Sequence, residues 1–189
     1  GNLNDISKQC IESSLIVQPL KPHQRTMLAA MIDLESSKIS LNHQSTIHTS
    51  IGICADVTAS GKSLEILACI AANPVLRPKE KVQLQFGTLV HLSSTHMPEI
   101  CTHLNLIVVP HSCVQQWNTY IQSFTKLNHI TITRRNQIQA FKLEAVPDSV
   151  HIVLVSNTMY NDFSDTVNCV WSRVIFDEAD SIAIPNTIT

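Results

Sequence analysis

Glycine is scarce in this chain. There are four glycines among 189 residues, whereas globular proteins average roughly 7%. Phosphate-binding loops and tight turns ordinarily use glycine, because it adopts backbone conformations that other residues avoid. The scarcity therefore argues against an ordinary glycine-rich phosphate loop.

An excess of positive charge and a long hydrophobic run are also missing. The 13 Lys and Arg residues are balanced by 15 Asp and Glu residues, for a net charge of -2. This balance excludes a polybasic arm, so any contact with nucleic acid has to be local and geometric. No run of 18 apolar residues is found, and we expect no membrane span.

The six cysteines form no C-x-x-C pair, and three of them lie within apolar runs. This pattern is typical of reduced, buried thiols in an intracellular protein rather than of a disulfide framework. The first residues also lack the basic and then apolar pattern of a secretory signal. Because the chain begins with Gly1 rather than Met, we expect a processed or recombinant start.

Hydrophobic residues make up 44% of the chain, enough for one compact domain with a sizeable core. Short apolar runs alternate with stretches of helical periodicity. Strands are expected over Ile51–Ala55, Leu104–Val109, Ile130–Thr133, His151–Val155 and Trp171–Phe176. Helices are expected over Pro22–Glu35, from Leu64 to Ala71, from Ser112 as cap to Phe124, over Asn136–Leu143 and near Met159–Phe163. Strands apolar on both faces predict a doubly wound α/β domain with a mainly parallel sheet.

Two further stretches are expected to be irregular. Residues from Ser36 to Ser50 are rich in Ser, Thr and His and predict a loop or weak hairpin. An insertion at about residues 77–103 alternates at Val82, Leu84 and Phe86, which indicates a hairpin. His91, His96, Cys101 and His103 fall in this insertion, but their spacing favours a solvated loop over a zinc site.

The most specific motif is Gly61, Lys62 and Ser63, at the junction of an expected strand and helix. Backbone N–H groups at a helix start bind phosphate oxygens, a Lys ammonium neutralises the β and γ charges, and a Ser hydroxyl can ligate Mg²⁺. The full G-x-x-x-x-G-K-[ST] pattern would have glycine where Asp56 stands. The motif therefore predicts a phosphate site with an incomplete glycine set.

A second motif ends the expected strand at Phe176 with Asp177, Glu178, Ala179 and Asp180. Carboxylates at the carboxyl end of a parallel strand lie where such sheets bind ligands. Asp177 can hold Mg²⁺, and Glu178 can orient and deprotonate an attacking water. The alternative is an acidic helix start that interacts with the helix dipole. Together with Lys62, the carboxylates are better explained as half of one nucleotide site.

Asp177 to Asp180 spell the Walker B motif of DEAD-type superfamily 2 helicases, and the chain resembles that superfamily from Leu20 onward. The resemblance implies a RecA-like P-loop NTPase lobe with ATP and Mg²⁺ as cofactors. Gln24 would read the adenine edge, Asp180 would couple hydrolysis to movement, and Ser63 with Asp177 would hold the metal. The ATP-binding loop would consist of Thr58, Ala59, Ser60, Gly61, Lys62 and Ser63.

Other segments resemble Swi/Snf-type translocases, and the stretch from Trp171 to Asn186 is similar to helicases of large cytoplasmic DNA viruses. The resemblance implies that the loops after two strands, Pro110 to Ser112 and Ser156 to Tyr160, grip one DNA or RNA strand by its phosphates. The residues concerned are Pro110, His111, Ser112, Ser156 and Asn157. The alternative for Ser112 and Ser156 is that they cap helices. Trp117, on a helix with apolar neighbours, is expected to pack in the core.

The chain departs from the superfamily pattern in three ways. Asp56 and Ala59 replace glycines of the loop, and the chain ends nine residues after Asp180. We therefore expect residues 1–189 to be a single N-terminal lobe whose partner, the second RecA-like lobe of the same polypeptide, is absent. Arginine fingers of such a lobe contribute about 10³–10⁵ in rate. The isolated lobe is expected to bind nucleotide weakly and hydrolyse it barely.

The expected function is thus that of an ATP-dependent helicase or translocase, in viral transcription if the narrower resemblance holds. The expected location is intracellular, in the cytoplasm or nucleus, or in a viral factory or virion. Two alternatives stay open. One is another P-loop enzyme such as a nucleotide kinase. The other is a catalytically silent lobe that serves as an interaction module in a larger transcription or remodelling assembly.

Overall fold

The computed structural model describes residues 7–36, 39–42, 45–47, 52–55, 60–74, 85–86, 88–89 and 100–179. Its centre is a four-stranded sheet with the order β6-β7-β5-β8, in which every neighbouring pair is parallel. The strands are β5 (Asn105–Val109), β6 (Asn128–Ile132), β7 (Val150–Ser156) and β8 (Arg173–Phe176). The predicted parallel sheet is confirmed.

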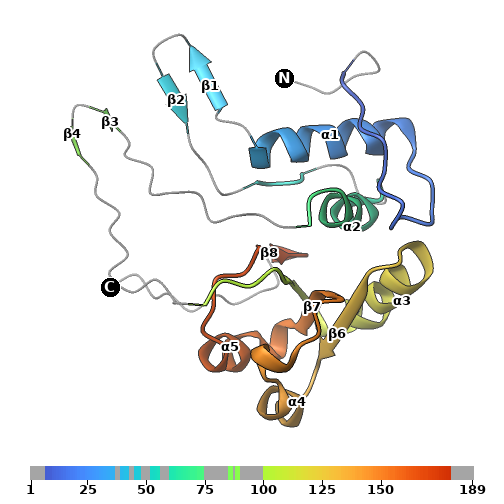
Figure 1. The fold of residues 1–189 in the computed structure, drawn as a ribbon, viewed down its shortest axis with the longest axis vertical. Coiled ribbons are helices and arrows are strands. Elements are labelled where there is room, and N and C mark those ends of the chain that lie inside the picture. The colour runs from blue at the N-terminus through green and yellow to red at the C-terminus, as the bar shows by residue number, and fades with distance from the viewer. Residues whose placement is uncertain are drawn as a thin grey trace.

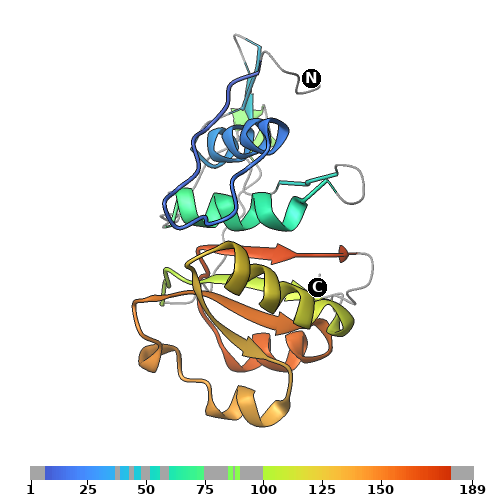
Figure 2. The ribbon, with the colours of Figure 1, turned by 90° about the vertical axis from the view of Figure 1, so that its right-hand side faces the viewer.

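Helices cover both faces of this sheet (Figures 1 and 2). On one face lie α2 (Lys62–Ala72) and α3 (Val114–Phe124), with α1 (Pro22–Ser36) packed against α2, and on the other face lie α4 (Arg135–Ala140) and α5 (Asn157–Thr166). Single-turn 3₁₀ helices occupy His111–Cys113 and Leu143–Ala145. The chain is therefore doubly wound, as its alternation of strands and helices predicts.

The period of two along each strand divides the core into two clusters. In β5, Ile107 and Val109 pack with residues of α1, α2 and α3, whereas Leu106 and Val108 pack with residues of α4 and α5. All of β5 is buried, which accounts for its continuous apolar run. Trp117 in α3 and Phe163 in α5 are among the largest fully buried side chains of the respective clusters.

Two small hairpins lie apart from the sheet. Strands β1 (Ile39–Asn42) and β2 (Ser45–Ile47) pair antiparallel, and so do β3 (Gln85–Phe86) and β4 (Thr88–Leu89). Both hairpins were predicted, and the rest of the insertion at about 77–103 lies mostly outside the described residues. No helix in the described ranges combines the length and apolarity that a membrane crossing needs.

The predicted strand over Ile51–Ala55 is wrong for the residues that are described. Gly52 to Ala55 have no regular secondary structure, and the Ile53 side chain is 88% exposed. A strand exists only through its hydrogen-bonded neighbour, and this segment pairs with none of the described strands. Strand β8, whose Val174 is also exposed, is accordingly an edge of the described sheet.

The helix cap predicted at Ser112 is also wrong. Ser112 lies inside the 3₁₀ turn, α3 begins at Val114, and its N-cap residue is Cys113, with no side-chain capping bond. The backbone makes the turn itself, because the Cys113 amide donates to the Pro110 carbonyl at 2.8 Å. The Ser112 hydroxyl is left on an exposed turn.

Candidate nucleotide and nucleic-acid site

The Gly61-Lys62-Ser63 motif begins α2, as predicted. Gly61 is its N-cap residue with φ 96°, in the left-handed region, and Lys62 is the first helical residue. The Gly61 carbonyl accepts from the amides of Leu64 and Glu65 at 2.9 and 3.2 Å. Lys62 and Ser63 therefore form the start of the first turn, at a helix end suited to an anion.

Gln24, in the first turn of α1, lies directly against this motif. Its Nε2 donates to the Ser60 carbonyl at 3.4 Å, and its Oε1 accepts from the Lys21 amide at 3.0 Å. A Cβ added at Gly61 would lie 2.3 Å from Gln24 Nε2. His23 Nε2 donates to the same Ser60 carbonyl at 3.3 Å. The sequence predicted that Gln24 reads the adenine base. In the structure, Gln24 lies against the residues that precede α2.

Asp177 follows the carboxyl end of β8. Its amide donates to the Val108 carbonyl at 3.0 Å, which continues the parallel ladder. One carboxylate oxygen, Oδ2, accepts from Trp117 Nε1 at 2.8 Å. The other, Oδ1, accepts no hydrogen bond from the residues that the structure describes. Figure 2 shows the end of β8 and the start of α2 on the same side of the molecule.

These residues fit a magnesium ion by their chemistry. Mg²⁺ prefers hard oxygen ligands, one or two of them from the protein, with the others from water and phosphate. The Asp177 carboxylate keeps one oxygen available, and the Ser63 hydroxyl comes from the first turn of α2. Asp177 and Ser63 would hold the ion.

Glu178 has an unusual backbone. Its φ is 49°, and among the described residues it is the only one other than glycine with positive φ. This conformation costs about 1–2 kcal/mol for an L-residue. It turns the chain sharply after β8 and leaves Glu178 exposed beside Asp177. Local strain of this kind is concentrated at functional sites.

The two predicted nucleic-acid loops meet at the carboxyl ends of β5 and β7. The Asn157 Oδ1 accepts from the His111 amide at 3.2 Å, and His111 Nδ1 shares a hydrogen bond with Ser156 Oγ at 3.2 Å. Ser156 Oγ also lies 2.9 Å from Thr158 Oγ1. Hydrogen bonds thus join the two predicted segments through His111, Ser156 and Asn157, and bring the loops together at one surface.

Not every member of this surface can touch a ligand. Ser156 has no exposed surface, so its side chain holds the loops together instead of meeting a phosphate. It is the N-cap residue of α5 but makes no side-chain capping bond. His111 and Ser112 are exposed, and so is Thr158, which lies in the second predicted loop directly after Asn157.

Four positions of the predicted site and its loop, Asp56, Thr58, Ala59 and Asp180, lie outside the described residues. So do His91 and His96 of the weighed zinc set, and no metal-capable cluster is present among the residues described. The six cysteines, all among the described residues, form no disulfide. Burial raises the pKa of the Cys69 thiol to about 12, so this cysteine is an inert core residue.

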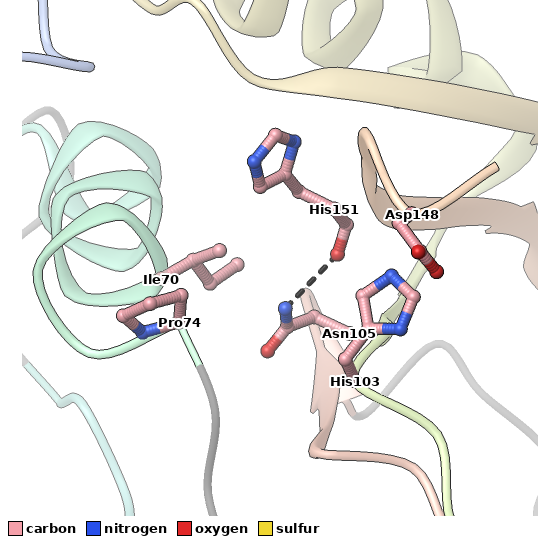
Figure 3. A pocket seen from close by; sticks show the side chains of 6 residues that line it. All are labelled: Ile70, Pro74, His103, Asn105, Asp148 and His151. Atoms are coloured by element: carbon pink, nitrogen blue, oxygen red, sulfur yellow. Dashed lines mark hydrogen bonds between the residues drawn. The ribbon is translucent and has the colours of Figure 1, made fainter.

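A cavity of about 280 Å³ lies at the amino ends of β5 and β7 (Figure 3). It is lined by Ile70, Pro74, His103, Asn105, Asp148 and His151. Two of its polar side chains bond to backbone carbonyls: Asn105 Nδ2 donates to the His151 carbonyl at 2.9 Å, and His103 Nε2 donates to the Val150 carbonyl at 3.0 Å. Ligands of open α/β sheets bind at the carboxyl ends instead.

Comparison with known proteins assigns the chain to a family. Residues 23–188 match the family described as SNF2-related domain. The chain is 27% identical over 147 residues to the "Putative helicase R592" of Acanthamoeba polyphaga mimivirus, and the match covers 65% of this chain and 17% of that protein.

The fold is similar to that of the Sulfolobus solfataricus SWI2/SNF2 ATPase core solved in complex with dsDNA. The TM-score is 0.52 at 15% identity, over 89% of this chain and 34% of that one. This likeness shows the RecA-like α/β fold. With the family match over residues 23–188, it leads to one conclusion: the chain belongs to the SNF2-related domain family of helicase superfamily 2.

Proposed function

We propose that this chain is the ATP-binding lobe of an ATP-dependent nucleic-acid translocase or helicase. One observation carries the proposal. The Gly61-Lys62-Ser63 helix start and the Asp177 carboxylate, far apart in sequence, lie on the same side of a family-matched RecA-like fold. This is the side on which open α/β sheets bind nucleotides.

The proposed roles follow from the side-chain chemistry. Lys62 neutralises the β- and γ-phosphate charge, and the first-turn amides of α2 bind phosphate oxygens. Ser63 and Asp177 hold Mg²⁺, which when bound screens the charge that develops on the phosphoryl oxygens. Glu178, exposed beside Asp177, orients and deprotonates the attacking water. Gln24 positions the loop at Ser60 and reads the adenine.

The proposed nucleic-acid surface is formed by Pro110, His111, Ser112, Asn157 and Thr158, with Ser156 as its internal support. Hydroxyls and backbone amides hold phosphates without a basic surface, which suits a chain of net charge -2. The fold neighbour was solved with dsDNA, and this favours DNA over RNA as the substrate.

Calorimetry with ATP and Mg²⁺ tests the nucleotide site. The wild-type chain is expected to bind weakly, and Lys62→Ala is expected to abolish the heat. Lys142→Ala, which removes an exposed lysine away from the site, is the matched control and should bind as the wild type does. Absence of heat in the wild type, even with the second lobe supplied, would instead favour a silent interaction module.

The nucleic-acid surface is tested by fluorescence anisotropy with labelled duplex DNA and with RNA. His111→Ala and Asn157→Ala should weaken binding, whereas the exposed control Ser164→Ala should not. Equal binding by all variants would place the nucleic acid elsewhere. The second lobe, a role in viral transcription and an intracellular location are parts of this proposal that the full polypeptide has to test, since the chain spans only 17% of its viral relative.

A further inference from the structure

The structure assigns to Trp117 the positioning of the Asp177 carboxylate for its metal. This inference rests on the proposed function and deepens it. In this role Trp117 contacts neither the nucleotide nor the ion, because it acts through Asp177. The sequence predicted a core residue, and burial is confirmed, with 1% of Trp117 exposed. Its polar atom adds a second role.

The Trp117 indole forms a hydrogen bond with the Asp177 carboxylate. The indole N–H is a donor only and needs a partner when it is buried. It finds one in Asp177 Oδ2 at 2.8 Å, a distance typical of a charge-assisted bond to a carboxylate. The bond fixes the rotation of the carboxylate and leaves Oδ1 without a donor among the described residues. An oriented carboxylate with one available oxygen is suited to a cation.

The Trp117 ring is held rigidly by the packing of the core. Trp117 belongs to the core cluster that also contains Leu67 and Ala68 of α2 and Ile107 of β5. Its ring therefore cannot turn away from Asp177 without disturbing the core. The same cluster supports the helix that begins with Lys62 and Ser63. Trp117 thus packs in one cluster with α2 and donates a hydrogen bond to the residue that follows β8, the two elements that carry the proposed metal ligands.

The helix α3, which carries Trp117, begins beside the proposed nucleic-acid surface. This helix follows the exposed 3₁₀ turn that carries His111 and Ser112, and Trp117 lies in its first turn. A single short helix therefore connects the proposed nucleic-acid surface to the proposed metal carboxylate. No other described side chain donates a hydrogen bond to Asp177.

The test compares ATP binding with Mg²⁺ and with EDTA in the full chain. Trp117→Phe retains an aromatic ring and removes the N–H. Partners that orient metal ligands are worth about 10–100-fold in metal affinity. We expect Trp117→Phe to lose at least about tenfold of the Mg²⁺ enhancement while its affinity in EDTA stays unchanged. Trp171→Phe, which removes the other tryptophan, packed against Phe163 away from Asp177, is the matched control.

A second measurement leaves Trp117 intact and so does not depend on the folding of the variant. In Trp171→Phe, Trp117 is the only fluorophore of its kind. Its emission is expected to change with Mg²⁺ and ATP together, and not with ATP in EDTA.

Three outcomes contradict the inference. A wild-type Mg²⁺ enhancement in Trp117→Phe, with no metal-dependent emission change, would leave the proposed function standing and show that the N–H is only structural. An equal loss of affinity in Mg²⁺ and in EDTA would indicate a packing effect. Absence of nucleotide binding in the wild type would overturn both this inference and the proposed function.

Discussion

Arg173 in β8 and Glu35 near the end of α1 form a bidentate salt bridge, although they are 138 positions apart in the sequence. Arg173 Nε and Nη2 donate to the two Glu35 carboxylate oxygens at 2.5 and 2.7 Å. Arg173 also donates to the Asn105 side chain at 2.9 Å and to the Asn73 carbonyl at 2.7 Å. One guanidinium thus connects α1, α2, β5 and β8, the elements around the candidate nucleotide site.

Arg173→Ala is expected to destabilise the chain by about 3–5 kcal/mol, because it leaves the Glu35 carboxylate without its charged partner in a largely buried site. The two side chains are 8% and 18% exposed. The measurement is urea unfolding followed by circular dichroism. Arg135→Ala breaks an exposed pair with Asp162 and should cost less than about 1 kcal/mol. Similar losses in the two variants would contradict the prediction.

Gly61→Ala should both destabilise the chain and weaken ATP binding. The left-handed φ of 96° is unfavourable for alanine, at a cost of about 1 kcal/mol. The new methyl group would also displace Gln24, whose Nε2 lies 2.3 Å from its position. The control is Gly52→Ala, whose methyl group would meet only Leu34 Cδ2 at 3.2 Å. Calorimetry and thermal melting would show a larger effect at Gly61, and a larger one at Gly52 would refute the assignment.

Substitution of Glu178 should separate stability from hydrolysis. Glycine accepts the φ of 49° without strain, whereas alanine does not. Glu178→Gly is therefore expected to be more stable than Glu178→Ala by about 1 kcal/mol. Both should lose hydrolysis measured with the second lobe supplied, because both lack the carboxylate. Retained hydrolysis in either variant would show that Glu178 does not have its proposed role. Equal stability of the glycine and alanine variants would show that the backbone at position 178 is not strained.

The stability of the chain should fall as the pH drops from 7 to about 5. Burial lowers the pKa of His129, and burial together with the nearby His103 lowers the pKa of His151. In the unfolded chain these rings protonate first, near pH 6.5. Stability is therefore complete above that pH and is lost below it. His151 Nδ1 accepts from the Asn128 amide at 3.2 Å, which only the neutral ring can do.

Urea midpoints at pH 7.5 and pH 5.5 test this dependence. His151→Gln should reduce the difference between the two midpoints, and His129→Gln should do the same. His23→Gln, at an exposed histidine, is the control. A pH dependence that none of the buried-site variants changes would have another origin.

Most helices and strands were predictable because their signals are local. The apolar runs of β5 and β7 indicated buried parallel strands, and the spacing of Val114, Trp117, Ile121 and Phe124 indicated one face of α3. Ile51–Ala55 carried the same apolar signal and is not a strand where it is described. The difference is pairing, since a strand needs a neighbour and the composition of a segment does not reveal one.

The amino-acid sequence by itself determined the doubly wound class and the identity of the chemical groups: Lys62 and Ser63 at a helix start, and Asp177 and Glu178 after a strand. Those properties depend on periodicity and residue type within a few positions. The tertiary structure alone decided which groups meet. Trp117 donates to Asp177 sixty residues away, Gln24 packs on Gly61, and His111 joins Ser156. The contact of Gln24 with Gly61 depends on the packing of α1 against α2, and the other two depend on the order of the parallel strands, whose carboxyl ends bring distant segments together.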